Sequence, residues 1–322
     1  MYYDRLFIHA MDLMVKELVR RALPRTAYGM GRRLVKRVRH RESLEPIEEE
    51  ALAGIVRDEL GLREGDLAIV HSSVDALGLG FPFTRLLPLL RRIVGSEGTL
   101  LFPATHLLER PERWFERDEV FDVRRTPTAM GLLSEMARRQ SDAARSLHPT
   151  HSVVAVGPLA GELVATHHCD PYPCGQKSPY SQVAERGGLI LGLGVDVDVL
   201  TSVHCVEEMG RVAFPVDTHR ERFYEGRVRS ETGQEHTVST LVAHPRTRWR
   251  SMRPFFKRHI SDSVCHRLEV GGRSFYRADA TALLERMERL AERGVTIYRN
   301  CIYRGHFLEP LLSRWAEKLE ER

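Results

Sequence analysis

One short segment of the sequence gathers side chains that could perform acid–base chemistry. It runs from Asp198 to Glu207 and contains the imidazole of His204, two carboxylates and the hydroxyl of Thr201. An apolar run over 189–195 directly precedes it and predicts a buried strand. Open α/β sheets bind their ligands beyond the carboxyl ends of such strands. Because a neutral histidine beside a carboxylate can take a proton from an amine near neutral pH, the segment predicts acyl transfer to an amine.

Two carboxylates could orient the imidazole of His204. A helix from Ser202 onward would place His204 and Glu207 three residues apart on one face, and Asp198 would lie on the loop just before it. Either carboxylate could hold one ring nitrogen and stabilise the charge that forms when the other nitrogen accepts a proton. The hydroxyl of Thr201 lies at the start of this helix, where it could simply act as a cap. The simpler alternative for His204 and Glu207 is a contact on the protein surface.

A second polar cluster has the sequence Arg-Ser-Leu-His-Pro-Thr-His-Ser over 145–152. Its histidines, His148 and His151, could join His204 and Glu207 as the ligands of a metal-dependent hydrolase, which is the first alternative function. The sequence contains neither a helical His-x-x-x-His pair nor a Cys-x-x-Cys pattern in this region, and Pro149 interrupts any regular helix. We therefore expect no metal.

A third cluster, His71-Ser72-Ser73, follows a predicted strand and precedes glycines at 78 and 80. Backbone amides and hydroxyls in such a loop can hold phosphate groups, although a plain turn is the simpler explanation. The segment is not a P-loop, and the chain has no Gly-x-Ser-x-Gly elbow and no complete Gly-x-Gly-x-x-Gly motif. A serine hydrolase and a nicotinamide enzyme are therefore disfavoured.

The composition is that of a water-soluble globular protein. The chain has 322 residues, 42% of them hydrophobic, which is enough to bury a core. It has no apolar run of about 18 residues and no recognisable signal peptide. Its five cysteines are an odd number, which favours reduced thiols and a cytoplasmic location.

Positive charge is concentrated at the N-terminus. Residues 1–45 hold eleven Lys and Arg against five Asp and Glu, whereas the formal net charge of the whole chain is only +4. We interpret residues 1–43 as a basic helical extension and 44–322 as the folded domain. The segment 1–42 could contact an anionic membrane surface, or it could be a solvated helix packed on the domain or on a second subunit of a homodimer. No nucleic acid is expected as a partner.

The hydrophobic pattern alternates between helices and strands. Strands are expected at 66–70, 99–102, 153–156 and 189–193, and helices at 46–60, 83–94, 128–139, 159–166, 182–186 and 202–209. Beyond residue 214 we expect antiparallel strands at 218–229 and 234–242 and helices at 251–259, 280–293 and 310–322. The predicted fold class is therefore α/β: a central mixed sheet flanked by helices, a β-richer C-terminal part and a helical N-terminal extension.

Six segments occur in an order that resembles the aminoglycoside 3-N-acetyltransferase family. They are Val70–Ser73, Gly98–Pro103, Thr126–Gly131, Arg145–Ser152, Ser178-Pro179 and Thr201–Glu207. The resemblance covers about residues 65–215 and implies a cytoplasmic α/β enzyme that transfers an acetyl group from acetyl-CoA to a primary amine without a metal. It identifies 44–322 as an acetyltransferase domain.

The resemblance also assigns residues to the site. It makes His204 the general base, with Asp198 and Glu207 as the acidic residues around it and Thr201 close to the thioester. The CoA-binding residues that it implies are His71, Ser72, Ser73, Val74, Pro103, Arg145 and Ser152. A non-catalytic family member whose basic arm binds a surface is the second alternative.

The acceptor is the point at which the chain departs from the family. Where the family usually has Gly-Tyr before the aspartate, this sequence has Asp196-Val197, and the basic extension is unusual. A polycationic aminoglycoside would favour an acidic cleft, which the nearly neutral domain does not predict. We therefore expect an amino sugar as the acceptor, either free, nucleotide-linked or part of a surface glycan, although an aminoglycoside-like acceptor is the alternative.

Overall fold

The computed structural model describes residues 44–320. The chain divides into two units at residue 46, and the second unit, Ile47–Arg322, contains all the elements below. The predicted basic helix over 1–43 and its surface contacts lie outside the described residues. Among the helices of residues 44–320, none has both the length and the apolar character needed to cross a membrane.

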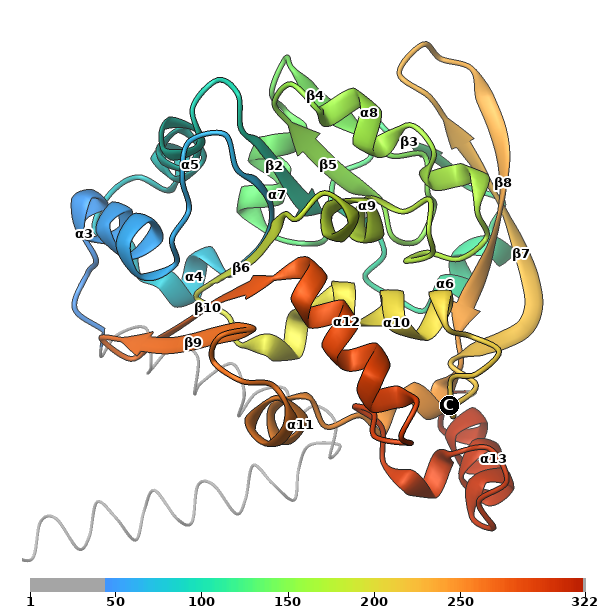
Figure 1. Cartoon of the computed structure of the whole chain (residues 1–322). Helices are drawn as coiled ribbons and strands as arrows, with labels where there is room; N and C mark the ends of the chain where they lie inside the picture. Colours follow the sequence, from blue (N-terminus) through green and yellow to red (C-terminus); the bar gives the residue numbers. More distant parts are fainter. Residues whose placement is uncertain (1–43, 321–322) are drawn as a thin grey trace, which may run out of the picture. The chain divides into compact units, whose positions relative to one another are not determined.

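The second unit is built on a seven-stranded mixed sheet, as predicted (Figure 1). The strand order is β4 (Ala143–Arg145), β5 (Val153–Val156), β2 (Thr99–Pro103), β1 (Leu67–Ser72), β6 (Leu189–Leu193), β10 (Arg273–Asp279) and β9 (Cys265–Val270). The central strand β1 is parallel to both of its neighbours, and every other pairing in the sheet is antiparallel. Parallel strands in the middle of a sheet are buried on both faces, which explains their continuous apolar runs.

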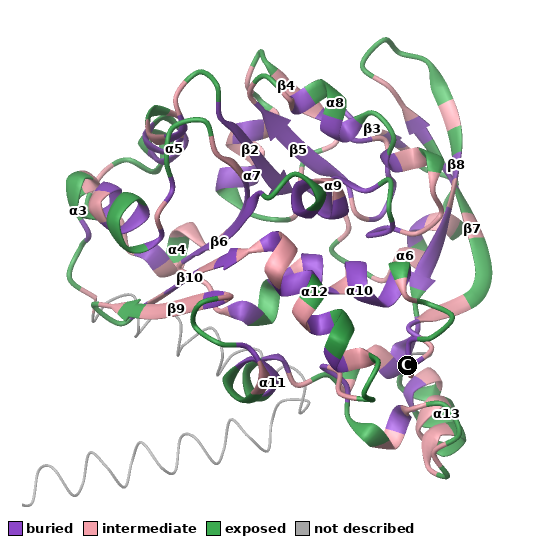
Figure 2. Cartoon of the chain, in the orientation of Figure 1, coloured by how far each residue is buried: buried purple, intermediate pink, exposed green. Residues whose placement is uncertain are grey.

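Successive residues of β1 point to opposite faces of the sheet and belong to different cores. Ala68 and Val70 pack in a cluster with α3 (Glu49–Gly54), α5 (Leu86–Val94) and α7 (Leu132–Arg138). Ile69 belongs to the other cluster, with α8 (Ala160–Val164), α9 (Pro179–Glu185), α10 (His204–Met209) and α12 (Ala280–Ala291). Figure 2 shows the buried strands between these helices. Helices on both faces of the sheet confirm the predicted fold class.

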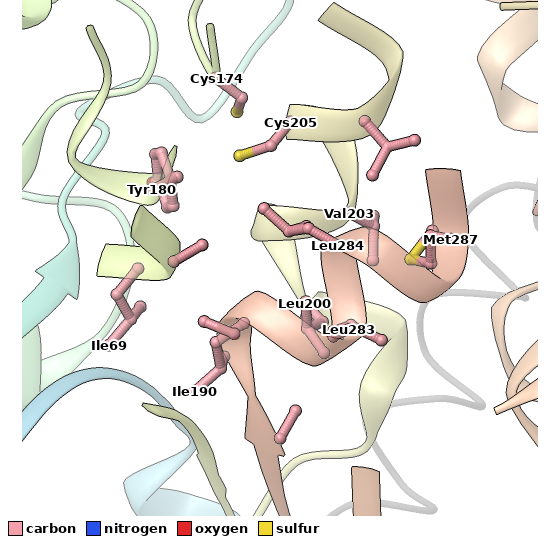
Figure 3. Close-up of a cluster of buried hydrophobic side chains, with 14 of the residues drawn as sticks. Ile69, Cys174, Tyr180, Ile190, Leu200, Val203, Cys205, Leu283, Leu284 and Met287 are labelled. Atoms are coloured by element: carbon pink, nitrogen blue, oxygen red, sulfur yellow. The ribbon is translucent and has the colours of Figure 1, made fainter. Parts of the chain in front are cut away.

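The second cluster fastens α10 to the sheet. Figure 3 shows the side chains of α9, α10 and α12 meeting there, with the sulfur atoms of Cys174 and Cys205 turned toward each other. Cys205 from α10 and Leu283 from α12 are fully buried. All five cysteines are free thiols. The start of α10, which carries His204, is therefore held on a rigid support.

A separate three-stranded sheet forms the β-richer part. It contains β3 (Val120–Asp122), β7 (His219–Arg229) and β8 (Glu235–Ala243) in that order, with β7 and β8 antiparallel as predicted (Figure 1). It covers a small core with Trp114 of α6 (Pro111–Glu116). The C-terminal part also contains the helices α11 (Met252–His259) and α13 (Glu309–Glu320).

The strands β9 and β10 were not predicted, although they complete the central sheet. They form a hairpin in which Val270 pairs with Arg273 across the two-residue turn Gly271-Gly272. Both glycines have positive φ, at 53° and 77°, as a type I′ turn requires. This Gly-Gly pair is a sequence signal for a hairpin, but the alternating Arg and Glu residues around it obscured the strands.

Two predicted helices begin later than their hydrophobic patterns suggested. The helix expected over 128–139 starts at Leu132, because Gly131 has φ 102° and breaks the helical backbone. The helix expected over 46–60 consists of α3 followed by a π-helical segment, Ile55–Glu59.

Candidate active site

Two loops meet at the carboxyl edge of the central sheet. Ser72 at the end of β1 pairs with Leu193 at the end of β6, and the amide of Ser73 donates to the carbonyl of Leu193 at 3.0 Å. Gly194 has φ 69°, and a Cβ there would lie 2.8 Å from the carbonyl oxygen of Ser73. Only glycine fits this close approach. The loop after β1 and the loop that leads to His204 therefore leave the same edge of the sheet, where α/β proteins bind ligands.

His204 and Glu207 form a pair at the start of α10. The Nδ1 atom of His204 lies 3.0 Å from Oε2 of Glu207, and the exposed fractions of the two side chains are 22% and 3%. Because Nδ1 faces a carboxylate, it carries the proton of the neutral ring, and Nε2 keeps a lone pair. The buried position of Glu207 excludes the alternative of a simple surface contact.

Tyr298 extends this pair to a chain of three residues. Its hydroxyl donates to Oε1 of Glu207 at 2.9 Å, and its ring is buried. The carboxylate is therefore held on both oxygens, by a phenol on one side and by the imidazole on the other. Tyr298 lies 91 residues from Glu207 in the sequence. No local motif indicates it, so sequence reasoning missed this residue.

Arg250 contacts the other nitrogen of the imidazole. Its Nη1 lies 3.2 Å from Nε2 of His204, where the guanidinium donates to the ring lone pair. The backbone of Arg250 forms an antiparallel bridge with Tyr298. Hydrogen bonds between residues 249–251 and 297–299 flank this bridge, at 2.7 and 3.0 Å. One short pairing thus brings both residues to the site.

The surroundings of His204 set its protonation. Burial alone would lower the pKa of His204, but the charge and hydrogen bond of Glu207 outweigh burial and the opposing charge of Arg250, so the pKa is raised. A second imidazole, His151, is close enough to His204 for the charge of His204 to lower its pKa. Burial, followed by that charge, lowers the pKa of His151 to about 3. Of the two imidazoles, His204 is therefore the one that can hold a proton.

Asp198 does not contact the imidazole. Its carboxylate is exposed and lies 2.7 Å from Nε of Arg253. The same nitrogen also pairs with Asp196. Of the two carboxylates that could orient His204, Glu207 does so and Asp198 does not. Thr201 is half-buried and is the first residue of a 3-10 turn, and its hydroxyl donates to the carbonyl of Val199 at 3.5 Å instead of accepting from a helix amide.

The predicted CoA-binding loop combines a buried imidazole with half-buried side chains. Burial lowers the pKa of His71 to about 4, and its Nε2 has no hydrogen-bond partner among residues 44–320. Ser72, Ser73 and Val74 are half-buried, and the hydroxyl of Ser73 caps the short helix α4 (Val74–Leu77) at 3.4 Å from the amide of Ala76. Pro103 is buried at the end of β2.

Arg145 and Ser152 act within the protein, in contrast to the expectation that they bind CoA. Arg145 is 5% exposed and donates to the carbonyls of Ala104 and, at 2.5 Å, Thr126, while its Nε lies 3.3 Å from the hydroxyl of Ser152. That hydroxyl donates in turn to Ala104 at 2.7 Å. Their polar atoms are already bonded, so we describe the pair as a clamp on the loops after β2 and β3.

Replacing Arg145 by methionine should therefore destabilise the fold. The change leaves buried carbonyls without donors and should lower the free energy of unfolding by about 3 kcal/mol, as measured by urea denaturation. The control is Arg91→Met, which removes an exposed pair with Asp142 and should cost less than about 1 kcal/mol. Weaker CoA binding by a still-folded Arg145→Met protein, with no loss of stability, would restore Arg145 as a ligand.

His148 cannot serve as a metal ligand in this arrangement. It is fully buried, and its Nδ1 accepts the amides of Thr150 and His151 at 3.3 and 3.1 Å. Its Nε2 is bonded to the hydroxyl of Thr240 at 3.2 Å. Nor does any group of three His, Cys, Asp or Glu side chains in the described part of the chain have the geometry of a metal site. The hydrolase alternative that combined His148 and His151 with His204 and Glu207 is therefore not supported.

Two cavities flank the pair of His204 and Glu207. Glu207 lines a cavity of about 600 Å³, and Arg250 and His151 line another of about 420 Å³. The two cavities share Leu241 and His244 of the β8 region. Each of the two residues that contact the imidazole of His204, Glu207 and Arg250, therefore lines one of these cavities.

The fold and this site define an α/β protein with a paired histidine and glutamate beyond the carboxyl edge of a mixed sheet. The model of the family "Aminoglycoside 3-N-acetyltransferase" matches residues 69–292. The chain belongs to the aminoglycoside 3-N-acetyltransferase family. The match continues well beyond residue 215, where the motifs read from the sequence ended, and so takes in Arg250.

Relatives in the family match parts of the chain. Aminoglycoside N(3)-acetyltransferase VIII of Streptomyces fradiae is 36% identical over 170 residues, which is 48% of this chain and 59% of that protein. Aminoglycoside N(3)-acetyltransferase III of Serratia marcescens is 33% identical over 196 residues, 55% of this chain and 71% of that protein. The first alignment thus spans less than two thirds of the relative.

Solved structures share the fold over a greater length. The crystal structure of aminoglycoside acetyltransferase AAC(3)-Xa has a TM-score of 0.66 at 22% identity and covers 81% of this chain and 98% of its own. The structure of AAC-IIIb in a binary complex with CoASH has a TM-score of 0.63 at 24% identity, covering 79% and 100%.

Proposed function

We propose that the protein is an N-acetyltransferase that moves an acetyl group from acetyl-CoA to a primary amine, with His204 as the general base. Membership of the aminoglycoside 3-N-acetyltransferase family supports the reaction class. The observation that carries the assignment of the base is the chain Tyr298–Glu207–His204, with distances of 2.9 and 3.0 Å. This chain fixes Nδ1 as the protonated nitrogen and leaves Nε2 as the basic one.

The arrangement meets the chemical need of the reaction. An alkylammonium group must lose a proton before its nitrogen can attack a carbonyl carbon. Nε2 of His204 takes that proton, and Glu207 stabilises the resulting imidazolium through Nδ1. The amine nitrogen forms the new bond to the acetyl carbon, the carbon–sulfur bond breaks, and the imidazolium gives its proton to the departing sulfur. The nitrogen then releases its one remaining surplus proton to the regenerated imidazole, from which it passes to solvent, and the neutral amide is left. The protein needs no nucleophile of its own, in agreement with the missing serine elbow.

Acetyl-CoA enters this account as a co-substrate that supplies the activated acetyl group. The residues proposed to hold it are His71, Ser72, Ser73 and Val74, with Pro103 beside them. The half-buried hydroxyls and the unpartnered Nε2 of His71 fit polar groups of such a ligand. The relative AAC-IIIb was solved with CoASH bound. Thr201 is proposed to lie near the thioester, as the family resemblance implies.

Replacing Ser73 by alanine should weaken the binding of CoA. Loss of one hydrogen bond of about 1 kcal/mol should raise the Kd of CoA and the KM of acetyl-CoA by roughly fivefold and leave kcat nearly unchanged. Calorimetry with CoA and steady-state kinetics provide the two measurements. The matched control is Ser96→Ala: Ser96 is exposed in the turn before β2, at the opposite edge of the sheet. Equal CoA affinity in the two variants would contradict the assignment of the loop.

The direct test of the function is a thiol-release assay. Purified protein is mixed with acetyl-CoA and a panel of amines that includes free amino sugars, nucleotide-linked amino sugars and aminoglycosides. Release of free CoA that depends on an amine and yields the N-acetyl product supports the proposal. Binding of CoA without acetylation of any amine in the panel would instead favour a non-catalytic member of the family.

A further inference from the structure

Arg250 stands where the reacting amine must come. Its Nη1 is 3.2 Å from Nε2 of His204, the nitrogen proposed to take the proton. A guanidinium is charged at any physiological pH and cannot accept a proton, so it blocks this nitrogen while it stays there. An acceptor must therefore draw Arg250 aside before its amine can be deprotonated. A cationic acceptor would bring a second positive charge to the same place, which is unfavourable.

The cavity beside Arg250 has a positive lining. Its titratable residues are Arg110, Glu112, His151, His244, Arg248 and Arg250. Glu112 is already paired with Nε of Arg220 at 2.9 Å. Burial is the main cause that lowers the pKa of His151 to about 3 and that of His244 to about 4, so both rings are neutral. The charged groups that line this cavity are thus three guanidinium groups and one carboxylate.

The larger cavity is balanced in charge, because four carboxylates and four guanidinium groups line it: Glu207, Asp217, Glu221 and Glu317 against Arg211, Arg220, Arg246 and Arg304. Asp217 pairs with Nε of Arg304 at 2.5 Å and also lies 3.6 Å from Arg246. Glu207 is occupied by His204 and Tyr298. Charge complementarity with the arginine-lined cavity therefore favours a negatively charged acceptor.

We propose that the acceptor carries an anionic group, a phosphate or a carboxylate, close to its reactive amine, and that Arg250 recognises this group. The anion forms a charge-assisted, two-point hydrogen bond with the guanidinium and draws it off Nε2 of His204. The same movement exposes the base at the moment when the amine arrives. This inference rests on the proposed function and adds a substrate class to it.

The phosphates of CoA are a second source of the same chemistry. The reacting end of CoA is the thioester, and its phosphates are separated from it by the whole pantetheine arm. The anion nearest to the base is therefore on the acceptor. If Arg250 instead served CoA, its loss would raise the KM of acetyl-CoA and leave the choice of acceptor unchanged, and that result would overturn the proposal.

The test compares acceptors that differ in charge. Wild-type protein, Arg250→Ala and the control Arg186→Ala are assayed with saturating acetyl-CoA and with glucosamine, glucosamine 1-phosphate, glucosamine 6-phosphate and sisomicin. Arg186 lies on the surface, paired with Glu162. We expect kcat/KM of the wild type to be at least about tenfold higher for one phosphorylated sugar than for glucosamine, as one good charged contact provides. Arg250→Ala should bring this ratio close to one, whereas Arg186→Ala should preserve it.

Two outcomes of this comparison would overturn the proposal. One is a wild-type preference for glucosamine or sisomicin over both phosphorylated sugars. The other is an equal ratio in Arg250→Ala and the wild type.

A measurement without turnover separates this inference from the proposed function. Calorimetry follows the binding of inorganic phosphate to the three proteins, and it should detect binding by the wild type and Arg186→Ala and about tenfold weaker binding by Arg250→Ala. If no amine in the panel reacts, the proposed function fails while phosphate binding still decides the anion site. Absence of phosphate binding by the wild type, or equal binding by Arg250→Ala, would count against the site itself.

Discussion

Replacement of His204 by alanine is expected to lower kcat by a factor of about 10² to 10⁴ while CoA still binds. General-base catalysis by a positioned histidine contributes about this much, and the variant keeps both cavities and the loop after β1. The measurements are thiol release at saturating acetyl-CoA and calorimetry with CoA. The matched control is His236→Ala, which removes a half-buried imidazole near the turn of the β7–β8 hairpin.

The two measurements on His204→Ala exclude trivial explanations. A variant that lost both activity and CoA binding would indicate a misfolded protein, and circular dichroism would check this. Unchanged kcat in a folded His204→Ala protein would assign the proton transfer to another group, and His151 would be the first to examine because it lines the neighbouring cavity.

Replacement of Glu207 by glutamine is expected to have the second largest effect, a loss of roughly 10³-fold in kcat. The amide keeps the shape of the side chain but removes the charge that stabilises the imidazolium and can turn its NH₂ group toward Nδ1. The neutral imidazole is the active form, so activity rises with pH through the pKa of His204. Glu207 raises this pKa, and its loss should move the acid limb of the pH profile to lower pH.

Tyr298→Phe provides a graded companion to this variant. The loss of one hydrogen bond to Glu207 should cost about 1 kcal/mol, or roughly fivefold in kcat. The carboxylate then carries more of its charge toward His204, and the acid limb should move to higher pH, opposite to Glu207→Gln. A loss of activity without any shift of the pH profile would mean that Tyr298 only supports the fold.

The variant Asp198→Asn tests which of the two carboxylates, Asp198 or Glu207, orients His204. Because Asp198 pairs with Arg253 at the surface, this change should reduce kcat far less than Glu207→Gln. Equal losses in the two variants would show that the pairing seen here is not the one used in catalysis.

The sequence predicted the half of the site that is local. Glu207 follows His204 by three residues on one helix, and the preceding strand is apolar throughout, so spacing and hydrophobicity sufficed to link them. The same reasoning could not choose between Glu207 and Asp198. That choice depends on Arg253, which lies far along the chain and draws Asp198 away.

The other half of the site depends on pairings between distant segments. Arg250 and Tyr298 lie in stretches without a motif, and the backbone bridge between them has no signature in local sequence. For Arg145, in contrast, the sequence predicted a ligand contact that the structure does not support. A polar residue within a family motif suggested a ligand contact, but burial under the loops after β2 and β3 gives it a structural role. Spacing can predict which residues share a helix face, but not which side chains are buried.

The bridge between Arg250 and Tyr298 has a consequence for the order of events in biosynthesis. During synthesis the ribosome makes most of the central sheet and the helix with His204 before it makes the segment with Tyr298. The strands made early are β1, β2, β5 and β6. Tyr298 follows more than ninety residues after the histidine. Until then Glu207 lacks its phenol and Arg250 lacks its backbone partner. The complete chain of Tyr298, Glu207 and His204 therefore forms late, after most of the scaffold has been synthesised.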